Sequence, residues 1–371
     1  MATLDSEDSD SEKWTSDVEA DTRRDFTEQH GPSNAVSACS APLDFFELFI
    51  DDTLLTLMET ETNRYGSQKD SSFVDTNKEE LKKFIALCIQ MGLVKMPKLR
   101  YYWSTRPALG GHAFAGKVMP RGRFEQLLRS LHFCDNSAPD GDRLYKIKEF
   151  VDIFNGICER NFHPGKEVTI DESLVPFRGR VVFRQYIPSK KHRYGIKIFK
   201  LCTRGGYTWR SMIYAGKTTR TGPLADTVVF SLMNGLLDSG RQLCCDNWYS
   251  SIGLAKKLLE RRTHLVATLR KNRSELPPLV KEKKLKRGEL YCLQIKDGIL
   301  VLKWRDKRDL MMLSTWHDGE RGASNKPKVV EDYNKLKGFV DQSDQMSAYS
   351  PFVRRTTKWY LRTFILSCKQ Q

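Results

Sequence analysis

The pattern of the chain changes across Pro164-Gly-Lys-Glu-Val-Thr-Ile-Asp-Glu-Ser173. Apolar residues recur at helical spacing before this stretch, whereas short apolar segments separated by Gly-rich turns follow it, as is typical of strands and hairpins. Within the stretch, Val168 to Ile170 predicts a buried strand that leads directly into Asp171. We therefore expect a helical domain upstream and, downstream, a mixed α/β sheet flanked by helices.

The upstream part, residues 41–165, has the periodicity of four amphipathic helices. Ser40 is in position to cap the first of these helices, and Thr76 with Glu79 forms a capping box before the second. The apolar faces of the four predicted helices run from Phe45 to Leu57, Leu81 to Ile89, Phe124 to Leu131 and Ile147 to Ile157.

The downstream part divides into three segments. Residues 166–271 alternate strands and helices and form the first part of the predicted core. In residues 272–330, two prolines and the basic run Lys281 to Arg287 come before three short strands, so we expect a small β-rich insertion. Residues 331–371 return to a helical pattern and are expected to supply the last part of the core. The elements expected in the first part are strands at 195–202, 209–215, 242–245 and 265–269 and helices at 225–237 and 252–259.

Charge is divided unevenly along the 371 residues, whose net charge is +15. Residues 1–60 hold 15 acidic and three basic residues, and the other 311 residues hold 58 basic and 31 acidic ones, a net charge of +27. Such a basic body favours a polyanionic partner, most simply nucleic acid, although a merely basic soluble protein is the alternative. Residues 1–40, rich in Ser, Asp and Glu, are expected to be an acidic disordered tail that solvates the chain or competes for the basic surface.

Several classes of protein are disfavoured by what the sequence contains. The longest apolar run, Phe84 to Val94, is much shorter than the ~20 residues that span a bilayer, so no membrane partner is expected. The acidic start of the chain does not resemble a secretory signal. The nine cysteines form no C-x2-C pair, and neither paired histidines nor a phosphate-binding glycine loop occurs, which disfavours zinc sites, helicases and dinucleotide enzymes.

Three aspartates directly follow short apolar segments. Asp171 follows Ile170, Asp246 follows a Leu-Cys-Cys segment, and Asp341 follows a Phe-Val pair. A carboxylate at the end of a buried strand is costly to ionise without a partner. Three such carboxylates would form an all-oxygen site suited to Mg2+ or Mn2+, and two such ions can activate an attacking oxygen and stabilise a leaving oxygen in phosphodiester displacement.

Each aspartate also has a purely structural interpretation. Asp171 could turn the chain, Asp246 with Asn247 is a common turn and capping pair, and Asp341 could cap the following helix. Asp344 lies three residues beyond Asp341 and would share its helix face, either as a fourth ligand or as an exposed capping partner.

Four segments around these aspartates resemble the piggyBac transposases and their host-domesticated derivatives, and they occur in the order of that family. Weaker similarity extends from about Asp44 to the end of the chain. The matching segments are Asp171-Glu-Ser-Leu-Val-Pro-Phe-Arg-Gly-Arg180, Tyr186-Ile-Pro-Ser-Lys190 with Tyr194-Gly-Ile-Lys-Ile198, Cys245-Asp-Asn-Trp-Tyr-Ser-Ser251, and Gly338-Phe-Val-Asp-Gln-Ser-Asp-Gln-Met346.

The resemblance implies an RNase H-like catalytic core with an insertion domain, preceded by a helical domain that binds DNA and dimerises. It implies that Asp171, Asp246 and Asp341 are catalytic and bind metal, with Asp344 as an additional metal ligand. Members of the family cut DNA at transposon ends, join the 3′-hydroxyl to TTAA target sites and resolve hairpin intermediates. The expected protein is therefore a nuclear, homodimeric DNA transposase that uses Mg2+ or Mn2+, with two ions per site.

Basic residues near the first aspartate and a basic segment with a Trp near the end are candidate DNA contacts. The first group could follow phosphates or form an ordinary solvated face. Trp359 could stack on an unpaired base or pack in the core, whereas Trp248 is expected to pack beside Asp246. The candidates are Arg178, Arg180, Lys190, Lys191, Arg193, Lys197, Arg354, Arg355, Lys358 and Trp359.

Two functions remain open at this point. Only Cys368 follows Cys292, so we expect the chain to lack the Cys-rich C-terminal module of autonomous family members. The three aspartates favour an active transposase, and the alternative is a catalytically inactive, domesticated or degenerate DNA-binding protein. A basic structural protein is least favoured, because it leaves the aspartates unexplained. The run Lys281 to Arg287 could be a nuclear localisation signal or a surface that touches DNA.

Overall fold

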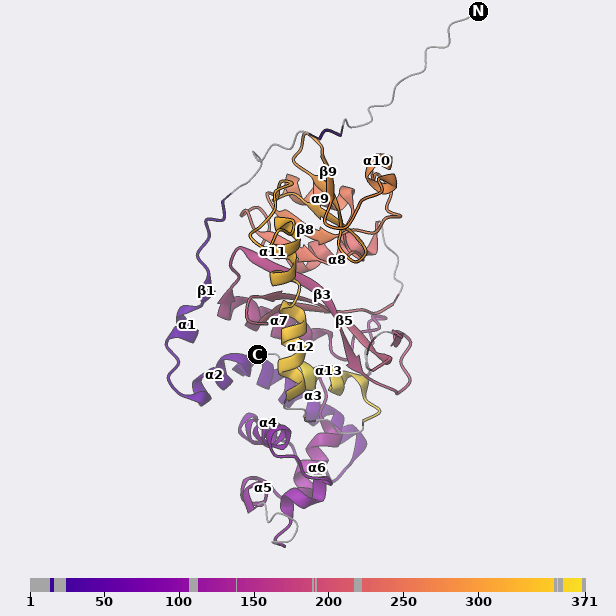
Figure 1. Cartoon of the computed structure of the whole chain (residues 1–371). Helices are drawn as coiled ribbons and strands as arrows, with labels where there is room; N and C mark the ends of the chain where they lie inside the picture. Colours follow the sequence, from indigo (N-terminus) through magenta and orange to yellow (C-terminus); the bar gives the residue numbers. More distant parts are fainter. Residues whose placement is uncertain are drawn as a thin grey trace, which may run out of the picture. The chain divides into compact units, whose positions relative to one another are not determined.

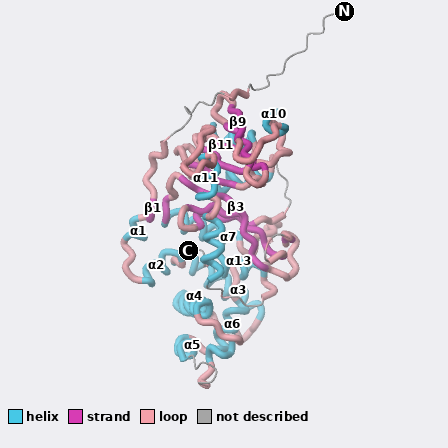
Figure 2. The backbone as a smooth tube through the Cα atoms, in the orientation of Figure 1, coloured by secondary structure: helices cyan, strands magenta, loops and turns pink. Residues whose placement is uncertain are grey.

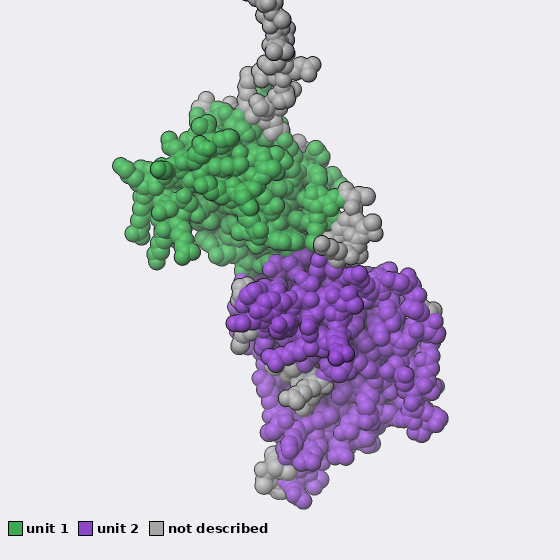
Figure 3. Space-filling view, turned by 90° about the vertical axis from the view of Figure 1, so that its right-hand side faces the viewer, with its two compact units in different colours: residues 1–29, 164–171, 220–339 green, residues 30–163, 172–219, 340–371 purple. Residues whose placement is uncertain are grey.

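The computed structural model describes residues 14–16, 25–106, 113–137, 139–188, 190, 192–216, 222–349, 352 and 356–368 (Figure 1). The chain forms two compact units, which Figure 3 shows in different colours. Unit 1 comprises residues 1–29, 164–171 and 220–339, and unit 2 comprises residues 30–163, 172–219 and 340–371. The predicted domains divide the chain by sequence pattern and the units divide it by contacts, so the predicted domain boundaries stay a prediction.

Unit 1 is built on a mixed sheet. The first half of β3 (Glu167–Pro176), β7 (Gln242–Cys245) and β8 (His264–Thr268) are parallel. Strands β11 (Asp309–Ser314), β10 (Leu300–Arg305) and β9 (Leu290–Gln294) continue the sheet from β8 in antiparallel order (Figure 2, magenta). The stretch predicted as a β-rich insertion therefore supplies three strands that extend the same sheet.

Helices connect and cover the sheet of unit 1. These helices are α8 (Leu224–Met233), α9 (Ile252–Glu260), α10 (Pro278–Glu282) and α11 (Lys328–Leu336). Parallel neighbours require a crossover, and α9 is the crossover between β7 and β8. Its N-cap is Ser251, whose hydroxyl accepts a hydrogen bond from the Leu254 N–H at 3.0 Å. On α11, Val329 and Val330 join the core formed by β8, β10 and β11.

Unit 2 contains the helical region and a second group of strands. Its apolar core joins helices far apart in the sequence, including Leu54, Phe84, Phe124, Phe150 and Phe364. The helices are α1 (Asn34–Ser37), α2 (Pro42–Phe49), α3 (Asp52–Lys69), α4 (Lys78–Leu93), α5 (Ala113–Val118), α6 (Arg121–Ser130), α7 (Lys148–Asn161), α12 (Phe339–Tyr349, of which all but the first residue belongs to this unit) and α13 (Trp359–Ser367), with a 3-10 helix at Leu99–Trp103.

The first predicted helix is in fact two helices, and Ser40 is not a helix cap. The carboxylate of Asp51 accepts from the Leu54 N–H at 2.9 Å and begins α3, which separates it from α2. At the start of α2, the carboxylate of Asp44 accepts from the Ser40 N–H at 2.9 Å. The apolar periodicity continues across both helices, so it does not reveal the break between them.

The capping box predicted before α4 is also wrong in its residues. Asn77 is the N-cap, and its side chain accepts from the Glu80 N–H at 2.9 Å. The hydroxyl of Thr76 instead donates to the Glu80 carboxylate at 2.6 Å. The helix therefore begins one residue later than Thr76 and Glu79 suggest.

The strands of unit 2 are β5 (Tyr194–Thr203), β6 (Thr208–Ile213), the two-residue β4 (Gln185–Tyr186) and the second half of β3. Strand β5 pairs with β3 and, in antiparallel register, with β4 and β6. Helix α7 packs on β6, and the side-chain amide of Asn155 donates to the Ser211 carbonyl and accepts from the Ser211 N–H, both at 2.9 Å.

Residues 25–40 fall in the predicted disordered tail, yet they make defined contacts. In unit 1, Glu28 forms an ion pair with the buried Arg241, whose guanidinium lies 4.9 Å from the centroid of the Phe26 ring. In unit 2, β1 (Gly31–Pro32) pairs with β2 (Phe162–His163). Composition predicts disorder from the mean properties of a segment, whereas these few specific contacts are enough to order this part of it.

Candidate active site and basic pockets

Asp171 and Asp246 lie at the same level of two adjacent parallel strands of unit 1. Ile170 on β3 pairs with Cys245, the last residue of β7, so Asp171 is the next residue of β3 and Asp246 directly follows β7. Strand β7 ends at Cys245, whereas β3 continues beyond Asp171 to Pro176. The prediction that Asp171 ends a strand is therefore wrong, because the apolar segment is only the buried first half of a longer strand. Both side chains are half-buried.

The strand segments that lead into this pair, Val168 to Ile170 and Leu243 to Cys245, are buried. Burial raises the pKa of the Cys244 and Cys245 thiols, and the charges of Asp171 and Asp246 raise it further. The carboxylate of Asp246 accepts a hydrogen bond from the Trp248 N–H at 2.8 Å, which is the turn that Asp-Asn predicts. Asp246 therefore forms the turn that its structural interpretation predicts, and it also lies beside Asp171 as a catalytic role would require.

Arg273 is a residue near this site that the sequence reasoning missed. Its guanidinium donates to the carbonyls of Asn247 at 3.0 Å and Trp248 at 2.7 Å, and so it holds the segment after Asp246 in place. The ring of Trp248 packs edge-on against Tyr249, with centroids 4.7 Å apart, which supports its expected packing role. Only the fold reveals Arg273, since it lies 25 positions from Trp248 in the sequence.

The Asp171 and Asp246 carboxylates are oxygen donors of the kind that hard divalent cations prefer. Among the described residues, no group of three or more His, Cys, Asp or Glu side chains is placed to hold a metal ion. The donor chemistry of the pair therefore fits Mg2+ or Mn2+, and the pair by itself supplies two carboxylates.

Asp341 and Asp344 lie on α12, in unit 2. Asp341 is exposed in the first turn of the helix and does not follow a strand, so the strand-end prediction is wrong there. Its short Phe-Val segment is instead the start of α12. The carboxylate of Asp344 accepts from the Lys200 ammonium at 2.6 Å and from the Ser173 hydroxyl at 2.7 Å.

Lys200 lies on β5 and its side chain is fully buried, with 0% exposure, whereas the Asp344 side chain is 37% exposed. A buried ammonium is costly unless a carboxylate and hydrogen bonds compensate it. Ser343 adds to this contact, because the Lys200 ammonium donates to its hydroxyl at 3.5 Å, and that hydroxyl also lies 2.8 Å from the hydroxyl of Thr208 on β6. The sequence reasoning did not single out Lys200, and its partner lies 144 positions away.

The structure separates the predicted basic DNA contacts into distinct groups. Lys190 and Lys197 both approach Glu172: the Lys190 ammonium donates to its carbonyl at 3.4 Å and the Lys197 ammonium lies 3.7 Å from its carboxylate. Lys197 also lies 4.6 Å from the centroid of the Phe199 ring. These two lysines therefore have protein partners within unit 2. Three other candidates, Lys191, Arg354 and Arg355, lie outside the described residues.

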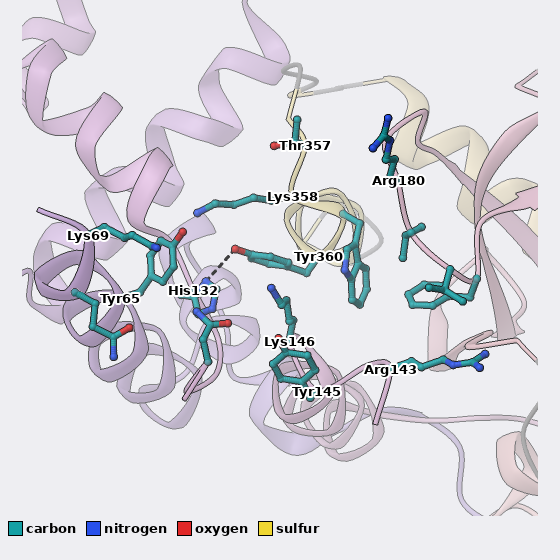
Figure 4. A pocket seen from close by; sticks show the side chains of 16 residues that line it. Tyr65, Lys69, His132, Arg143, Tyr145, Lys146, Arg180, Thr357, Lys358 and Tyr360 are labelled. Carbon is teal, nitrogen blue, oxygen red and sulfur yellow. Dashed lines mark hydrogen bonds between the residues drawn. The ribbon is translucent and has the colours of Figure 1, made fainter. Parts of the chain in front are cut away.

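Arg180, Lys358 and Trp359 line one pocket of unit 2, with a volume of about 700 Å³, which we call the α13 pocket (Figure 4). Trp359 packs edge-on against Phe183, with centroids 5.0 Å apart, and contacts the apolar core. Trp359 therefore packs in the core and also lines the pocket. The fold is compatible both with core packing and with stacking on an unpaired base.

Arg178 and Arg193 line a second pocket of unit 2, with a volume of about 650 Å³. His192 and Arg362 line it as well. Burial lowers the pKa of Arg362, and its buried Nε has no hydrogen-bond partner among the described residues. Both pockets are therefore rich in cations, and in both the lining residues include no Asp or Glu.

A comparison with known families identifies the chain. The family model described as Transposase IS4 matches residues 41–368. The chain belongs to this family. The human PiggyBac transposable element-derived protein 2 is 28% identical to this chain, and the match covers 86% of this chain and 58% of that protein. The human PiggyBac transposable element-derived protein 3 is 25% identical, and the match covers 89% of this chain and 59% of that protein. The chain thus spans about three fifths of these curated relatives.

A solved structure shows the same fold. The cryo-EM structure of the piggyBac transposase synaptic complex with hairpin DNA matches 92% of this chain and 76% of its own, with a TM-score of 0.84 and 30% sequence identity. The predicted resemblance to piggyBac transposases is confirmed, as is the α/β fold class with a mixed sheet, flanking helices and an RNase H-like core.

Proposed function

We propose that this member of the transposase family is a piggyBac-like DNA transposase that hydrolyses and transfers phosphodiester bonds. The observation that carries the proposal is the placement of Asp171 on β3 and of Asp246 directly after the adjacent parallel strand β7, within a chain that matches a piggyBac transposase fold. Asp341, the third aspartate of the matching segments, completes the proposed catalytic set.

Transposases of the DDE type generally use divalent metal ions. In this chain, Asp171, Asp246 and Asp341 are the proposed ligands of Mg2+ or Mn2+, with Asp344 as an additional carboxylate and two ions per site. When bound, the metal would polarise the phosphodiester and lower the pKa of the attacking oxygen. Trp248 and Arg273 act before that step by holding the segment that carries Asp246.

The proposed partner is double-stranded DNA, with transposon ends and a TTAA target. The net charge of +27 beyond residue 60 supports this partner, as do the two cation-lined pockets. The matched cryo-EM structure is a complex with hairpin DNA, which supports the same assignment by family likeness. We propose a nuclear location because DNA is the proposed substrate, and a homodimer because the resemblance to piggyBac transposases implies one. Among the described helices, none is both long and apolar enough to cross a membrane.

The proposal is tested by DNA cleavage. Supercoiled plasmid and TTAA-flanked transposon-end DNA are incubated with the protein and Mg2+ or Mn2+, and nicks are counted on gels. Asp246→Asn should abolish nicking while DNA binding persists. Asp297→Asn, at an exposed position in the same unit, is the matched control and should nick like the unaltered protein. Nicking that survives in Asp246→Asn would contradict the proposed site.

The alternative is a catalytically inactive, domesticated or degenerate DNA-binding protein. The names of the curated human relatives describe them as derived from transposable elements, and this supports the alternative of a domesticated protein. It predicts salt-sensitive DNA binding, no nicking with either metal and no effect of Asp246→Asn on affinity. Cleavage and binding measured on the same preparation distinguish the two functions.

A further inference from the structure

Three lysines from distant parts of the chain gather in the α13 pocket of unit 2. Lys69 is the last residue of α3, Lys146 lies just before α7, and Lys358 lies just before α13. Figure 4 shows Lys69, Lys146 and Lys358 around the rings of Tyr65 and Tyr360. Arg143 and Arg180 complete the set of five cationic side chains on the pocket wall.

Of the three lysines, Lys358 has the closest contacts with neighbouring residues. Its ammonium donates to the Arg129 carbonyl and lies 4.4 Å from the centroid of the Tyr65 ring. Burial, together with the charges of Lys146 and Lys69, lowers the pKa of Lys358 to about 8. The three ammonium groups therefore repel one another in a site where one of them is partly removed from water.

No carboxylate of the described residues neutralises this cluster by an ion pair. The pocket lining contains no Asp or Glu. The carboxylates of Glu61 and Asp135, which belong to the same part of unit 2, are bound by Arg64 at 2.7 Å and 3.5 Å. Since uncompensated like charges cost free energy, an anion that enters the pocket gains attraction from several cations at once.

Aromatic side chains that contact one another form the wall of the pocket beside these lysines. Tyr65 stacks on His132 with centroids 4.3 Å apart, and the Tyr360 hydroxyl lies 2.9 Å from His132 Nδ1 (Figure 4, dashed line). Lys146 lies 5.5 Å from the centroid of the Tyr145 ring and 5.9 Å from that of Tyr360. Rigid aromatic side chains reduce the entropy lost when the cations engage a ligand.

We propose that the α13 pocket is a phosphate-binding site in which Lys69, Lys146 and Lys358 bind the oxygens of a phosphate or polyphosphate group. Ammonium groups bind phosphate as point charges through several rotatable donors, so a cluster of three suits a multiply charged anion better than a single carboxylate. The same chemistry is presented by a 5′-phosphate on a DNA strand and by a free polyphosphate. Phosphate binding at this site does not require the proposed cleavage activity.

The test is titration of the whole chain with inorganic tripolyphosphate by calorimetry. We expect saturable binding that weakens about tenfold in Lys146→Met and in Lys358→Met, because each removes one charge-assisted contact. Lys117→Met, which removes an exposed lysine of α5 in the same unit outside the pocket, should leave affinity unchanged. Equal weakening in all three variants, or no saturable binding, would overturn the proposal. Lys146 is only half-buried, so its variant keeps the test decisive if Lys358→Met does not fold.

A second arm identifies the source of the phosphate. A 5′-phosphorylated single-stranded oligonucleotide is compared with its 5′-hydroxyl form as a competitor of tripolyphosphate. Competition that requires the 5′-phosphate supports a DNA-borne ligand, and its absence alongside tripolyphosphate binding supports a free polyphosphate. Asp246→Asn should bind tripolyphosphate like the unaltered protein, so loss of cleavage and loss of phosphate binding are separate results.

Discussion

At the scale of single residues, the Lys200–Asp344 pair makes an asymmetric prediction. Asp344→Asn leaves the fully buried Lys200 ammonium without its counter-charge, so we expect a loss of about 3 kcal/mol in the free energy of unfolding. Lys200→Met leaves a carboxylate that is 37% exposed and still hydrogen-bonded by Ser173, so it should cost less. Urea denaturation of both single variants and the double variant measures this difference. Equal losses in the two single variants would contradict the assignment of the buried charge.

His132 predicts how stability depends on pH. Burial is the main cause that lowers the pKa of this side chain to about 4, and the Tyr360 hydroxyl lies 2.9 Å from Nδ1. An unfolded chain protonates its histidines near pH 6.5, so between pH 6.5 and 4 it binds a proton that the folded chain does not. Stability should therefore fall as the pH falls through this window, by roughly 3 kcal/mol in total.

The control for this prediction is His132→Gln, which does not titrate and keeps an acceptor for Tyr360. Its unfolding free energy is measured at pH 7 and pH 4.5 beside that of the unaltered protein. The variant should lose less stability than the unaltered protein across this interval, even if it is less stable at pH 7. A slope with pH that is the same in both proteins would show that other groups dominate.

At the scale of elements, the attachment of α7 to β6 depends on one side chain. Asn155 satisfies both the N–H and the carbonyl of Ser211 on the edge of β6 that does not pair with β5. Asn155→Leu removes both hydrogen bonds and leaves backbone groups without partners, so we expect a loss of about 1–3 kcal/mol in the free energy of unfolding. Thermal denaturation checks the loss, and amide exchange of β6 should rise more than that of β10. Uniform exchange across the chain would contradict a local role.

At the scale of the whole molecule, the uneven charge predicts self-competition for DNA. Residues 1–13 hold five acidic residues and one basic residue, whereas Thr15 pairs with Gln294 of β9 and Glu28 pairs with Arg241, so both should be kept. Deleting residues 1–13 should strengthen nonspecific DNA binding about threefold at low salt, and the gain should shrink as salt screens the charges. Fluorescence anisotropy at several salt concentrations measures this. An affinity that does not change at low salt would exclude competition by this segment.

Much of the local structure can be predicted from the sequence. Strand β7, helix α9 and the helical pattern upstream of residue 165 follow from apolar spacing, because a helix or strand needs only a local repeat to bury one face. The resemblance around Asp171, Asp246 and Asp341 likewise depends on short contiguous segments. The errors lie at boundaries, where Asp51 begins a second helix within the first predicted one and Asn77 caps α4 in place of Thr76, since several neighbouring polar residues can satisfy the same N–H groups.

The features with the clearest chemical consequences depend on contacts across the chain. The strand register sets Asp171 beside Asp246, and the fold alone joins Lys200 to Asp344 and Arg273 to the carbonyl of Trp248. The same holds for Lys69, Lys146 and Lys358, which no local pattern connects but which share one pocket. Local periodicity specifies which face of an element is apolar. The packing of those faces then decides which charged groups come together in a low-dielectric space. This packing depends on many weak contacts between distant residues, so no short stretch of sequence predicts it.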